Sequence, residues 1–370
     1  MEVKAAVLRE FGKPVTIETV DLADPKANEV MVRVAAVGFC HSDLHVFLGE
    51  IPVPLPIVLG HETAGVVEKV GPGVTKVKPG DRVVCVWMVP CGKCFQCLNG
   101  RPNICEGNFP VFLGGQLLDG TSRMTGADGK SIGQAFFVSG FSTYTVVPED
   151  GAIPLHKDIP FEQACQLGCS VPTGWGTVVN LANVKAGTAV AVYGCGAIGL
   201  NVIRAASLRH ANPIIAVDLA GAKQEIAMEF GATHFIDSSK EDPVPKIVEL
   251  TGGAGAEYAF EAIGDPGAII QAWWSIRMGG KVIIPGITPA EATTNLPLML
   301  LPLQAKGVIG TLYGEIKPAV DVPKLIDLMA TGALKTDKLI TRKIKLEDIN
   351  DAAQAMLERE ILGRWVIMMD

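Results

Sequence analysis

Four cysteines stand close together in one turn-rich stretch of the sequence. They follow the pattern Cys-x-x-Cys-x-x-Cys, with a fourth cysteine eight positions later, and are Cys91, Cys94, Cys97 and Cys105. Four thiolates close a tetrahedral shell around a metal ion and leave no position for a substrate. The spacing therefore predicts a structural zinc ion that folds a lobe at about residues 88–110. An iron–sulfur cluster is the competing interpretation, but there is no second cluster motif and no proline after the fourth cysteine. The third interpretation is that these are four unrelated buried thiols.

A second set of metal-binding side chains is spread along the chain. Cys40, His61 and Cys169 each lie in a short segment flanked by glycine. A single cysteine or histidine in such a place is more often a core residue than a ligand. Together, two thiolates and one imidazole make an open zinc site, whose fourth position is free for water or an alcohol.

A glycine-rich turn predicts a dinucleotide site. The glycines of a G-x-G-x-x-G pattern, Gly194, Gly196 and Gly199, follow a predicted strand at 189–193 and open a predicted helix at 198–209. In that context the glycines admit a pyrophosphate at the N-terminus of the helix.

An acidic residue after the next predicted strand bears on the choice of cofactor. Asp218 follows the strand 214–217 and can accept hydrogen bonds from the adenosine ribose, whereas it repels a 2′-phosphate. No Arg or Ser follows it directly, so the sequence favours NAD over NADP. Asp218 could instead cap a helix, and Lys223 could either approach the same ribose or be a solvated surface charge.

The secondary-structure elements that must hold these residues follow two different patterns along the sequence. The first 150 residues consist of short alternating runs and turns, which predict a mostly β domain. From about residue 171, strands and helices alternate as in a doubly wound parallel sheet, giving an α/β fold. The further expected strands are 258–262 and 281–285, and the further helices are 222–230 and 268–278. A tail with helices at 322–330 and 346–359 and a strand at 364–368 has no place in that sheet, so we assign it to the first domain.

Composition bounds the kind of protein. A chain of 370 residues exceeds what one core usually supports, so we expect two domains with a binding cleft between them. A net charge of −7 without a Lys/Arg-rich run argues against nucleic acid as a partner. No apolar window reaches the roughly 18 residues of a membrane span, and the N-terminus lacks the apolar stretch of a signal peptide. We therefore expect a cytoplasmic protein without membrane partners, where nine cysteines indicate metal binding rather than disulfides.

Three motifs in the same order resemble those of the zinc-dependent alcohol dehydrogenases, in the medium-chain dehydrogenase/reductase superfamily. They are the G-H-E-x-x-G segment 60–65, the four-cysteine lobe, and the segment 168–174. The resemblance covers essentially the whole chain. It implies a GroES-like catalytic domain at 1–170 that resumes at 312–370, and a Rossmann-type NAD-binding domain at 171–311.

The resemblance also implies roles at the open zinc site. Cys40, His61 and Cys169 become the ligands of a catalytic zinc, in addition to the structural ion, so that each chain holds two zinc ions. Glu62 becomes a transient ligand, and Asp43 supports His61. Cys165 is the rival third ligand, but it lacks the Pro-Thr-Gly sequence that follows Cys169.

For the cofactor, the resemblance implies contacts to each part of NAD. His41 and Arg364 contact the pyrophosphate and Thr173 the nicotinamide side, while the residues that line the cofactor are Ile198, Ile263 and Ile287. The family often has Arg where this chain has His41. A neutral imidazole holds a phosphate less strongly than a guanidinium does, so we expect looser NADH binding and a release step that depends on pH.

For catalysis, the resemblance implies that zinc acts as a Lewis acid on the alcohol while a hydride passes to NAD. Ser42 matches the hydroxyl of a proton relay, and His45 matches the histidine that passes the proton to water through the cofactor ribose. Ser42 could instead cap a turn, and His45 could be an exposed side chain.

The expected substrate is an apolar alcohol, either primary or secondary and long-chain, allylic or aromatic. Its pocket is expected to include Ile51, Trp87 and Phe136. The alternative is an S-(hydroxymethyl)thiol (glutathione-type) formaldehyde dehydrogenase. Such members of the family use a basic group in the segment 108–113 to bind the carboxylate of the thiol carrier. This chain has no Arg there, so that activity ranks second. Polyol dehydrogenases usually replace the third ligand with a carboxylate, and a zinc-stabilised NAD-binding sensor is the non-enzyme alternative. The segment 112–134 resembles the insertion of the long dimeric members, and an apolar strand at 296–303 could pair two chains, so we expect a homodimer.

Overall fold

The structure is a computed structural model that describes residues 1–369. The chain divides into two compact units. Unit 1 consists of residues 1–169 and the chain from Lys317 onward, and unit 2 runs from Ser170 to Ile316. Residues 312–316, which the sequence analysis assigned to the returning tail, therefore lie in unit 2. The reason is packing, because Gly314 lies so close to Gly176 of the same unit that a Cβ on Gly176 would meet its carbonyl oxygen at 2.0 Å.

Unit 1 contains a small closed barrel. Its strands run in the order β1, β2, β7, β8 and β4. Their bounds are Glu2–Leu8 for β1, Thr16–Leu22 for β2, Ile57–Val58 for β4, Met124–Thr125 for β7 and Ser131–Gln134 for β8. The β1–β2 pairing is antiparallel, and the side chains of β1 from Ala5 to Leu8 are buried.

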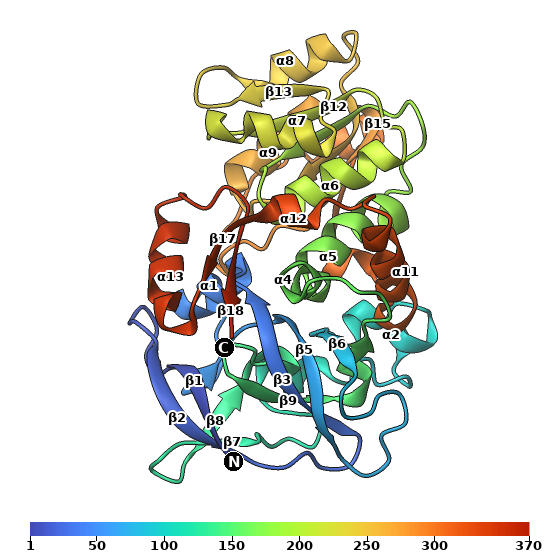
Figure 1. Cartoon of the computed structure of the whole chain (residues 1–370). Helices are drawn as coiled ribbons and strands as arrows, with labels where there is room; N and C mark the ends of the chain where they lie inside the picture. Colours follow the sequence, from blue (N-terminus) through green and yellow to red (C-terminus); the bar gives the residue numbers. More distant parts are fainter. Residues whose placement is uncertain (370) are drawn as a thin grey trace. The chain divides into compact units, whose positions relative to one another are not determined.

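A seven-stranded sheet carries most of the site residues of unit 1. Its order is β10, β6, β5, β3, β18 and β17, and β9 pairs with β3 outside this path. The bounds are Glu29–Gly38 for β3, Glu62–Val70 for β5, Arg82–Cys85 for β6, Tyr144–Pro148 for β9, Ala152–Pro154 for β10, Ile340–Ile344 for β17 and Arg364–Met368 for β18. The C-terminal strand β18 lies beside β3 (Figure 1), so the end of the chain returns to unit 1.

Short helices fill the connections of unit 1. They are α1 (His41–Leu48), α2 (Phe95–Leu98), α3 (Phe109–Leu113), α4 (Phe161–Ala164), α11 (Pro318–Ala330), α12 (Thr336–Leu339) and α13 (Ile349–Leu357). The 3-10 turns are η1 (Pro102–Ile104), η2 (Ala135–Phe137), η3 (Glu149–Gly151), η4 (Cys165–Gly168) and η8 (Leu346–Asp348).

Unit 2 is a doubly wound α/β domain around one parallel sheet. The strand order is β13, β12, β11, β14, β15 and β16, which is the Rossmann order 3-2-1-4-5-6. The bounds are Val190–Tyr193 for β11, Ile214–Asp218 for β12, His234–Asp237 for β13, Ala256–Glu261 for β14, Ile276–Ile284 for β15 and Gly307–Gly310 for β16. The predicted fold class is confirmed.

Helices cover this sheet and supply its core. They are α5 (Ser170–Gly176), α6 (Ala197–Leu208), α7 (Gln224–Phe230), α8 (Pro243–Leu250), α9 (Pro266–Ser275) and α10 (Leu300–Gln304), with a π-helical turn at Thr177–Leu181 and 3-10 turns η6 (Gly221–Lys223) and η7 (Tyr313–Glu315). Tyr193, Ile215 and Trp273 belong to one buried cluster that also contains alanines of β14 and α9. No helix within residues 1–369 is long and apolar enough to cross a membrane.

Two predicted elements of unit 2 are wrong. The helix expected at 268–278 ends at Ser275, because Ile276 takes an extended conformation and pairs with Ala256 to open β15. The apolar strand expected at 296–303 does not form. Pro297 and Pro302 cannot donate to a strand ladder, and residues 300–304 form α10 instead. The edge strand of the sheet is β16, a few residues later.

Candidate functional site

Cys40, His61 and Cys169 come together in unit 1. All three side chains are buried, and their ligand atoms lie within 4.8 Å of one another. Around a tetrahedral zinc with Zn–S bonds of about 2.3 Å, neighbouring sulfur ligands lie about 3.8 Å apart. The residues present therefore fit one metal ion, and the set offers three ligands and one open position.

The sheet explains why these residues meet. Gly38 at the end of β3 pairs with Glu62 at the start of β5, which places Cys40 and His61 beside each other. Cys169 arrives from η4. A Cβ on Gly168 would meet the carbonyl oxygen of Cys85 at 2.9 Å and that of His61 at 3.0 Å, so only glycine lets this turn approach the sheet so closely.

The carboxylate of Asp43 joins the two ligand segments. Its Oδ2 accepts the Cys40 N–H at 3.1 Å, and its Oδ1 accepts the Gly60 N–H at 3.1 Å and contacts His61 Nδ1 at 3.0 Å. This contact fixes the His61 tautomer with a proton on Nδ1 and leaves Nε2 as the ligand atom. Burial opposes the charged imidazole, but Asp43 and Cys40 outweigh it and raise the pKa of His61.

An arginine from the C-terminal strand lies against the same site. Arg364 donates to Glu62 Oε1 at 2.9 Å and to the Phe39 carbonyl at 2.8 Å, and it lies 3.9 Å from Cys40 Sγ. The hydrogen bond from Cys169, followed by the charges of Arg364 and His61, lowers the pKa of Cys40. Arg364 thus contacts the neighbours of the metal set, and its contact with the pyrophosphate stays a prediction.

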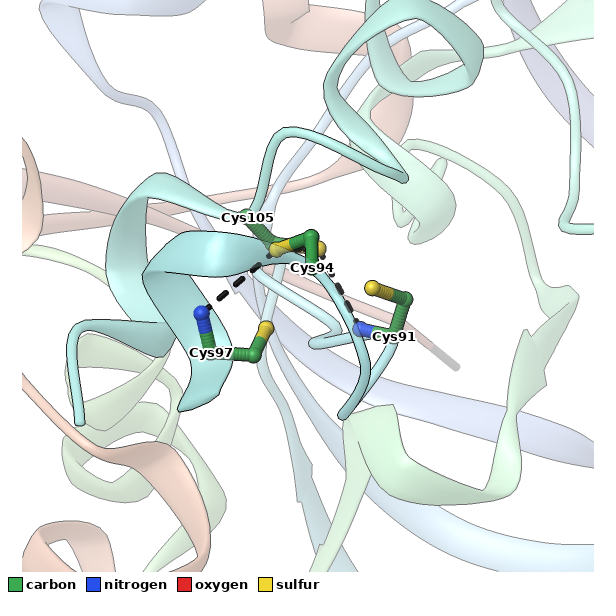
Figure 2. Close-up of side chains that lie close together, drawn as sticks. All are labelled: Cys91, Cys94, Cys97 and Cys105. Carbon is green, nitrogen blue, oxygen red and sulfur yellow. Dashed lines mark hydrogen bonds between the residues drawn. The ribbon is translucent and has the colours of Figure 1, made fainter. Parts of the chain in front are cut away.

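The four cysteines of the lobe form the second metal set. Figure 2 shows their sulfur atoms pointing toward one another, and the ligand atoms lie within 4.8 Å. Cys94 Sγ lies 4.0 Å from Cys105 Sγ and accepts the Cys97 N–H at 3.5 Å, while Cys105 Sγ accepts the Cys91 N–H at 3.2 Å. The Cys97 N–H is the main cause that lowers the pKa of Cys94 to about 6, which favours a thiolate. The set fits a tetrahedral ion.

Aromatic rings surround the imidazole of His61. Phe136 and Trp87 both meet it edge-on, with ring centroids 5.6 Å and 6.4 Å away. Phe112 stacks on Phe136 at 4.6 Å and lies 5.5 Å from Trp87. Phe136 and Phe137 have φ of 56° and 60°, a conformation that strains bulky residues and is held only by the surrounding packing.

In unit 2, the glycine turn lies between β11 and α6, where the strand order reverses. Gly194 has a φ of +92°, and a Cβ on Gly199 would meet the Gly194 carbonyl oxygen at 1.7 Å. A Cβ on Gly196 would meet nothing within 4 Å, so open space lies over the N-terminus of α6. This geometry fits a pyrophosphate.

Asp218 ends β12 next to this turn. Its Oδ2 accepts the Cys195 N–H at 2.7 Å, and its Oδ1 accepts the Ala220 N–H at 2.9 Å. Lys223 donates to the same carboxylate at 3.1 Å, and both side chains are largely buried. Lys223 is therefore a partner of Asp218 and not a solvated surface charge.

Comparison with known proteins places the chain in a family. Residues 26–157 match the alcohol dehydrogenase GroES-like domain, and residues 197–331 match the zinc-binding dehydrogenase domain. The chain is 38% identical to an NDMA-dependent alcohol dehydrogenase of Amycolatopsis methanolica, over 100% of this chain and 99% of that one. The chain belongs to the zinc-dependent alcohol dehydrogenase family. It is an oxidoreductase that acts on alcohols.

Other members of the family are similar over the whole chain. An S-(hydroxymethyl)glutathione dehydrogenase of Paracoccus denitrificans is 40% identical over 96% of this chain and 97% of that one. The crystal structure of the benzyl alcohol dehydrogenase from Acinetobacter calcoaceticus matches with a TM-score of 0.93 and 33% identity, over 100% of both chains. The resemblance inferred from three motifs is thus confirmed.

The predicted relay residues of this alcohol dehydrogenase lie on helix α1. Ser42 is half-buried in the first turn, and His45 is buried one turn later. His45 Nδ1 contacts the carboxylate of Glu50, a residue that the sequence analysis missed. Ile51, a predicted pocket residue, follows directly and donates its N–H to the His45 carbonyl.

The remaining candidates stay separate from the metal sets. Cys165 is buried, donates to the Glu162 carbonyl at 3.3 Å and belongs to neither metal set found within residues 1–369. Burial raises the pKa of the Cys85 thiol to about 12 and also raises that of Cys195, so both favour the neutral form. Thr173 lies on α5 in unit 2, where its carbonyl accepts the Thr177 hydroxyl at 2.7 Å.

Glu261 is a second residue that the sequence analysis missed. It is fully buried at the end of β14, and its Oε1 accepts the N–H groups of Ile263, Gly264 and Asp265 at 3.0, 2.9 and 3.3 Å. A Cβ on Gly264 would meet the carbonyl of Ile287 at 2.0 Å, so the two loops that carry predicted cofactor residues touch here. The side chains of Ile263 and Ile287 are exposed on these two loops, and Ile198 is half-buried on α6.

We expect Cys105→Ser to remove one zinc per chain and to lower the melting temperature by about 5 to 15 °C, because the metal holds the lobe folded. Metal analysis by mass spectrometry and differential scanning calorimetry measure both effects. Cys165→Ser is the matched control and should keep the full zinc content. Iron instead of zinc, with visible absorbance, would show a cluster, and unchanged zinc in Cys105→Ser would contradict the predicted ligand set.

We expect Glu261→Gln to weaken NADH binding by about 3- to 10-fold, because a neutral amide holds the three loop N–H groups less strongly than a carboxylate does. A fluorescence titration of NADH measures the change. Glu257→Gln, on the same strand, is the matched control. Equal affinity of Glu261→Gln and wild type would show that these loops do not depend on the charge.

Proposed function

We propose that this enzyme binds two zinc ions and NAD and reversibly oxidises an apolar primary or secondary alcohol to an aldehyde or ketone. The observation that carries the proposal is the aromatic surround of the open Cys₂His set. Trp87 and Phe136 lie against the His61 ring, and Phe112 stacks on Phe136. Aromatic rings favour an apolar substrate, and an aromatic or allylic alcohol fits them best.

Within this proposal, a bound zinc ion would supply Lewis acidity at the alcohol oxygen, and bound NAD would supply the acceptor for the hydride. The residues of the chain do the rest. Cys40, His61 and Cys169 hold the ion, and Asp43 keeps the imidazole in one tautomer. Ser42 and His45 take the proton of the hydroxyl group toward solvent.

NAD is the cofactor that unit 2 fits best. We infer that the pyrophosphate binds in the open space over Gly196 and that Asp218, next to this turn, accepts hydrogen bonds from the ribose hydroxyls. Its charge opposes a 2′-phosphate, although Lys223 offsets part of that charge. We therefore expect a strong preference for NAD over NADP, but a smaller one than an aspartate without a lysine partner would give.

Activity on a glutathione adduct of formaldehyde is the second candidate. It is favoured by the name of the 40% identical Paracoccus relative. The segment 108–113, where we expected a basic residue for such a substrate, forms α3 and places Phe112 against Phe136. An apolar ring at this position favours the alcohol without a charged carrier.

We further propose that two chains form a homodimer through the outer edge of the unit 2 sheet. The edge strand β16 follows α10, and in this helix and the two residues before it Leu298, Met299 and Leu303 are 71%, 69% and 65% exposed. Exposed apolar groups of this size beside an open sheet edge favour association. A cytoplasmic location remains a prediction from the sequence.

The test measures metal content and NAD⁺ reduction on the purified protein with a panel of alcohols, from ethanol through allylic and benzylic alcohols to polyols, and with an S-hydroxymethyl thiol. We expect two zinc ions per chain and the highest kcat/KM with benzylic or allylic alcohols. One zinc without turnover would contradict the proposal. Activity with the thiol adduct alone would favour the second candidate.

A second prediction concerns the histidine next to Cys40. Partial loss of hydration, followed by the charge of His45, lowers the pKa of His41, so its ring is mainly neutral at pH 7. The neutral ring gains a charge only as the pH falls through that lowered value. We therefore expect His41→Arg to tighten NADH binding about 5- to 10-fold at pH 7 and to remove its pH dependence. His234→Arg is the control, and an unchanged Kd in His41→Arg would contradict a phosphate contact.

A further inference from the structure

Three titratable side chains form a row along helix α1. The rings of His41 and His45 meet edge to face with centroids 4.9 Å apart. Beyond His45, the row ends at Glu50, whose carboxylate contacts His45 Nδ1. The row therefore starts beside the metal ligand Cys40 and ends in an acidic group.

Local backbone geometry builds this row. Residues four apart lie on the same face of a helix, which aligns His41 with His45. Gly49 ends the helix with a φ of 81°, and the N–H groups of Glu50 and Ile51 both donate to the His45 carbonyl, at 2.8 and 3.2 Å. This turn folds the chain back and sets Glu50 beside the histidine.

Exposure to solvent rises over the last step of the row, from His45 to Glu50. The side chain of His45 is 10% exposed, whereas that of Glu50 is 33% exposed. The carboxylate thus touches a nearly buried imidazole and solvent at once.

Stabilisation of the helix does not explain this carboxylate. The C-terminus of a helix carries partial negative charge, so an acidic residue there is unfavourable for the helix itself. The contact with His45 is what accounts for a Glu at this position.

We propose that Glu50 positions His45 for proton transfer and forms the solvent end of the proton path. The proposal rests on the relay role that the proposed function gives to His45. A carboxylate can only accept a hydrogen bond, so a neutral His45 must carry its proton on Nδ1 and present the lone pair of Nε2. When Nε2 takes the proton released by the alcohol, the Nδ1 proton passes to Glu50 and then to water. One proton enters and one leaves, which leaves His45 as the Nε2–H tautomer. The Nδ1–H tautomer forms again when the Nε2 proton exchanges with solvent and Nδ1 takes a proton through Glu50.

The experiment compares Glu50→Ala and Glu50→Gln with wild type and with Glu10→Gln, an exposed glutamate that serves as the charge-matched control. The first readout does not need turnover. NMR of the purified full-length enzyme labelled with ¹⁵N-histidine gives the tautomer of each ring, and His45→Gln identifies the His45 signals. We expect the Nδ1–H tautomer in wild type and in Glu10→Gln, and a shift to the Nε2–H tautomer in Glu50→Ala.

The second readout is the rate of proton release on mixing with NAD⁺ and benzyl alcohol, followed with an indicator dye in stopped flow. We expect a drop of about 10-fold in Glu50→Ala and Glu50→Gln, with a larger solvent deuterium effect and unchanged zinc content. An unchanged His45 tautomer in Glu50→Ala, or unchanged proton release in both variants, would overturn the proposal. If wild type itself does not turn over, the proposed function fails, and the tautomer measurement alone decides the pairing of Glu50 with His45.

Discussion

The catalytic half of this enzyme depends on one buried carboxylate. Asp43 is fully buried, and a buried charge is tolerated only when hydrogen bonds replace its water. Three groups do so, the N–H groups of Cys40 and Gly60 and the His61 ring. These donors come from the ends of two strands that pair at Gly38 and Glu62. The same contacts that stabilise the carboxylate therefore set the distance between two metal ligands.

Unit 2 repeats this device with different residues. Asp218 accepts the N–H of Cys195 in the glycine turn and that of Ala220 after β12, and Glu261 accepts three N–H groups in the loop after β14. The two carboxylates stand at the carboxyl ends of β12 and β14, the two strands that flank β11. Each holds a loop of backbone in a fixed shape. A cofactor can then bind to loops that are ordered before it arrives, which lowers the entropy cost of binding.

Much of the site could be predicted from the sequence because the decisive patterns are local. The glycine turn and the four-cysteine lobe each lie within a few residues, and their spacing alone implies the chemistry. Phe112 and Glu261 escaped prediction because their roles depend on partners brought close only by folding. The contacts of Arg364 with Glu62 and with the Phe39 carbonyl were not foreseen for the same reason, since they form only once β18 has paired with β3. The strand expected at 296–303 does not form because Pro297 and Pro302 lack the N–H groups that a strand ladder needs, however apolar their neighbours are.

Charge balance connects these contacts to the metal. Two thiolates, Cys40 and Cys169, offset the two charges of a zinc ion, and Glu62 and Arg364 offset each other at 2.9 Å. Asp43 is then the remaining buried charge of this site, and the three hydrogen bonds that it accepts replace the water that the carboxylate loses on burial. With His61 as a neutral ligand, the carboxylate of Asp43 is the charge that this set leaves unbalanced, and it contacts the imidazole at Nδ1 and not at the ligand atom Nε2. A metal ion bound at Nε2 would be separated from this carboxylate by the imidazole ring, and could then act as a Lewis acid that stabilises negative charge on the alcohol oxygen.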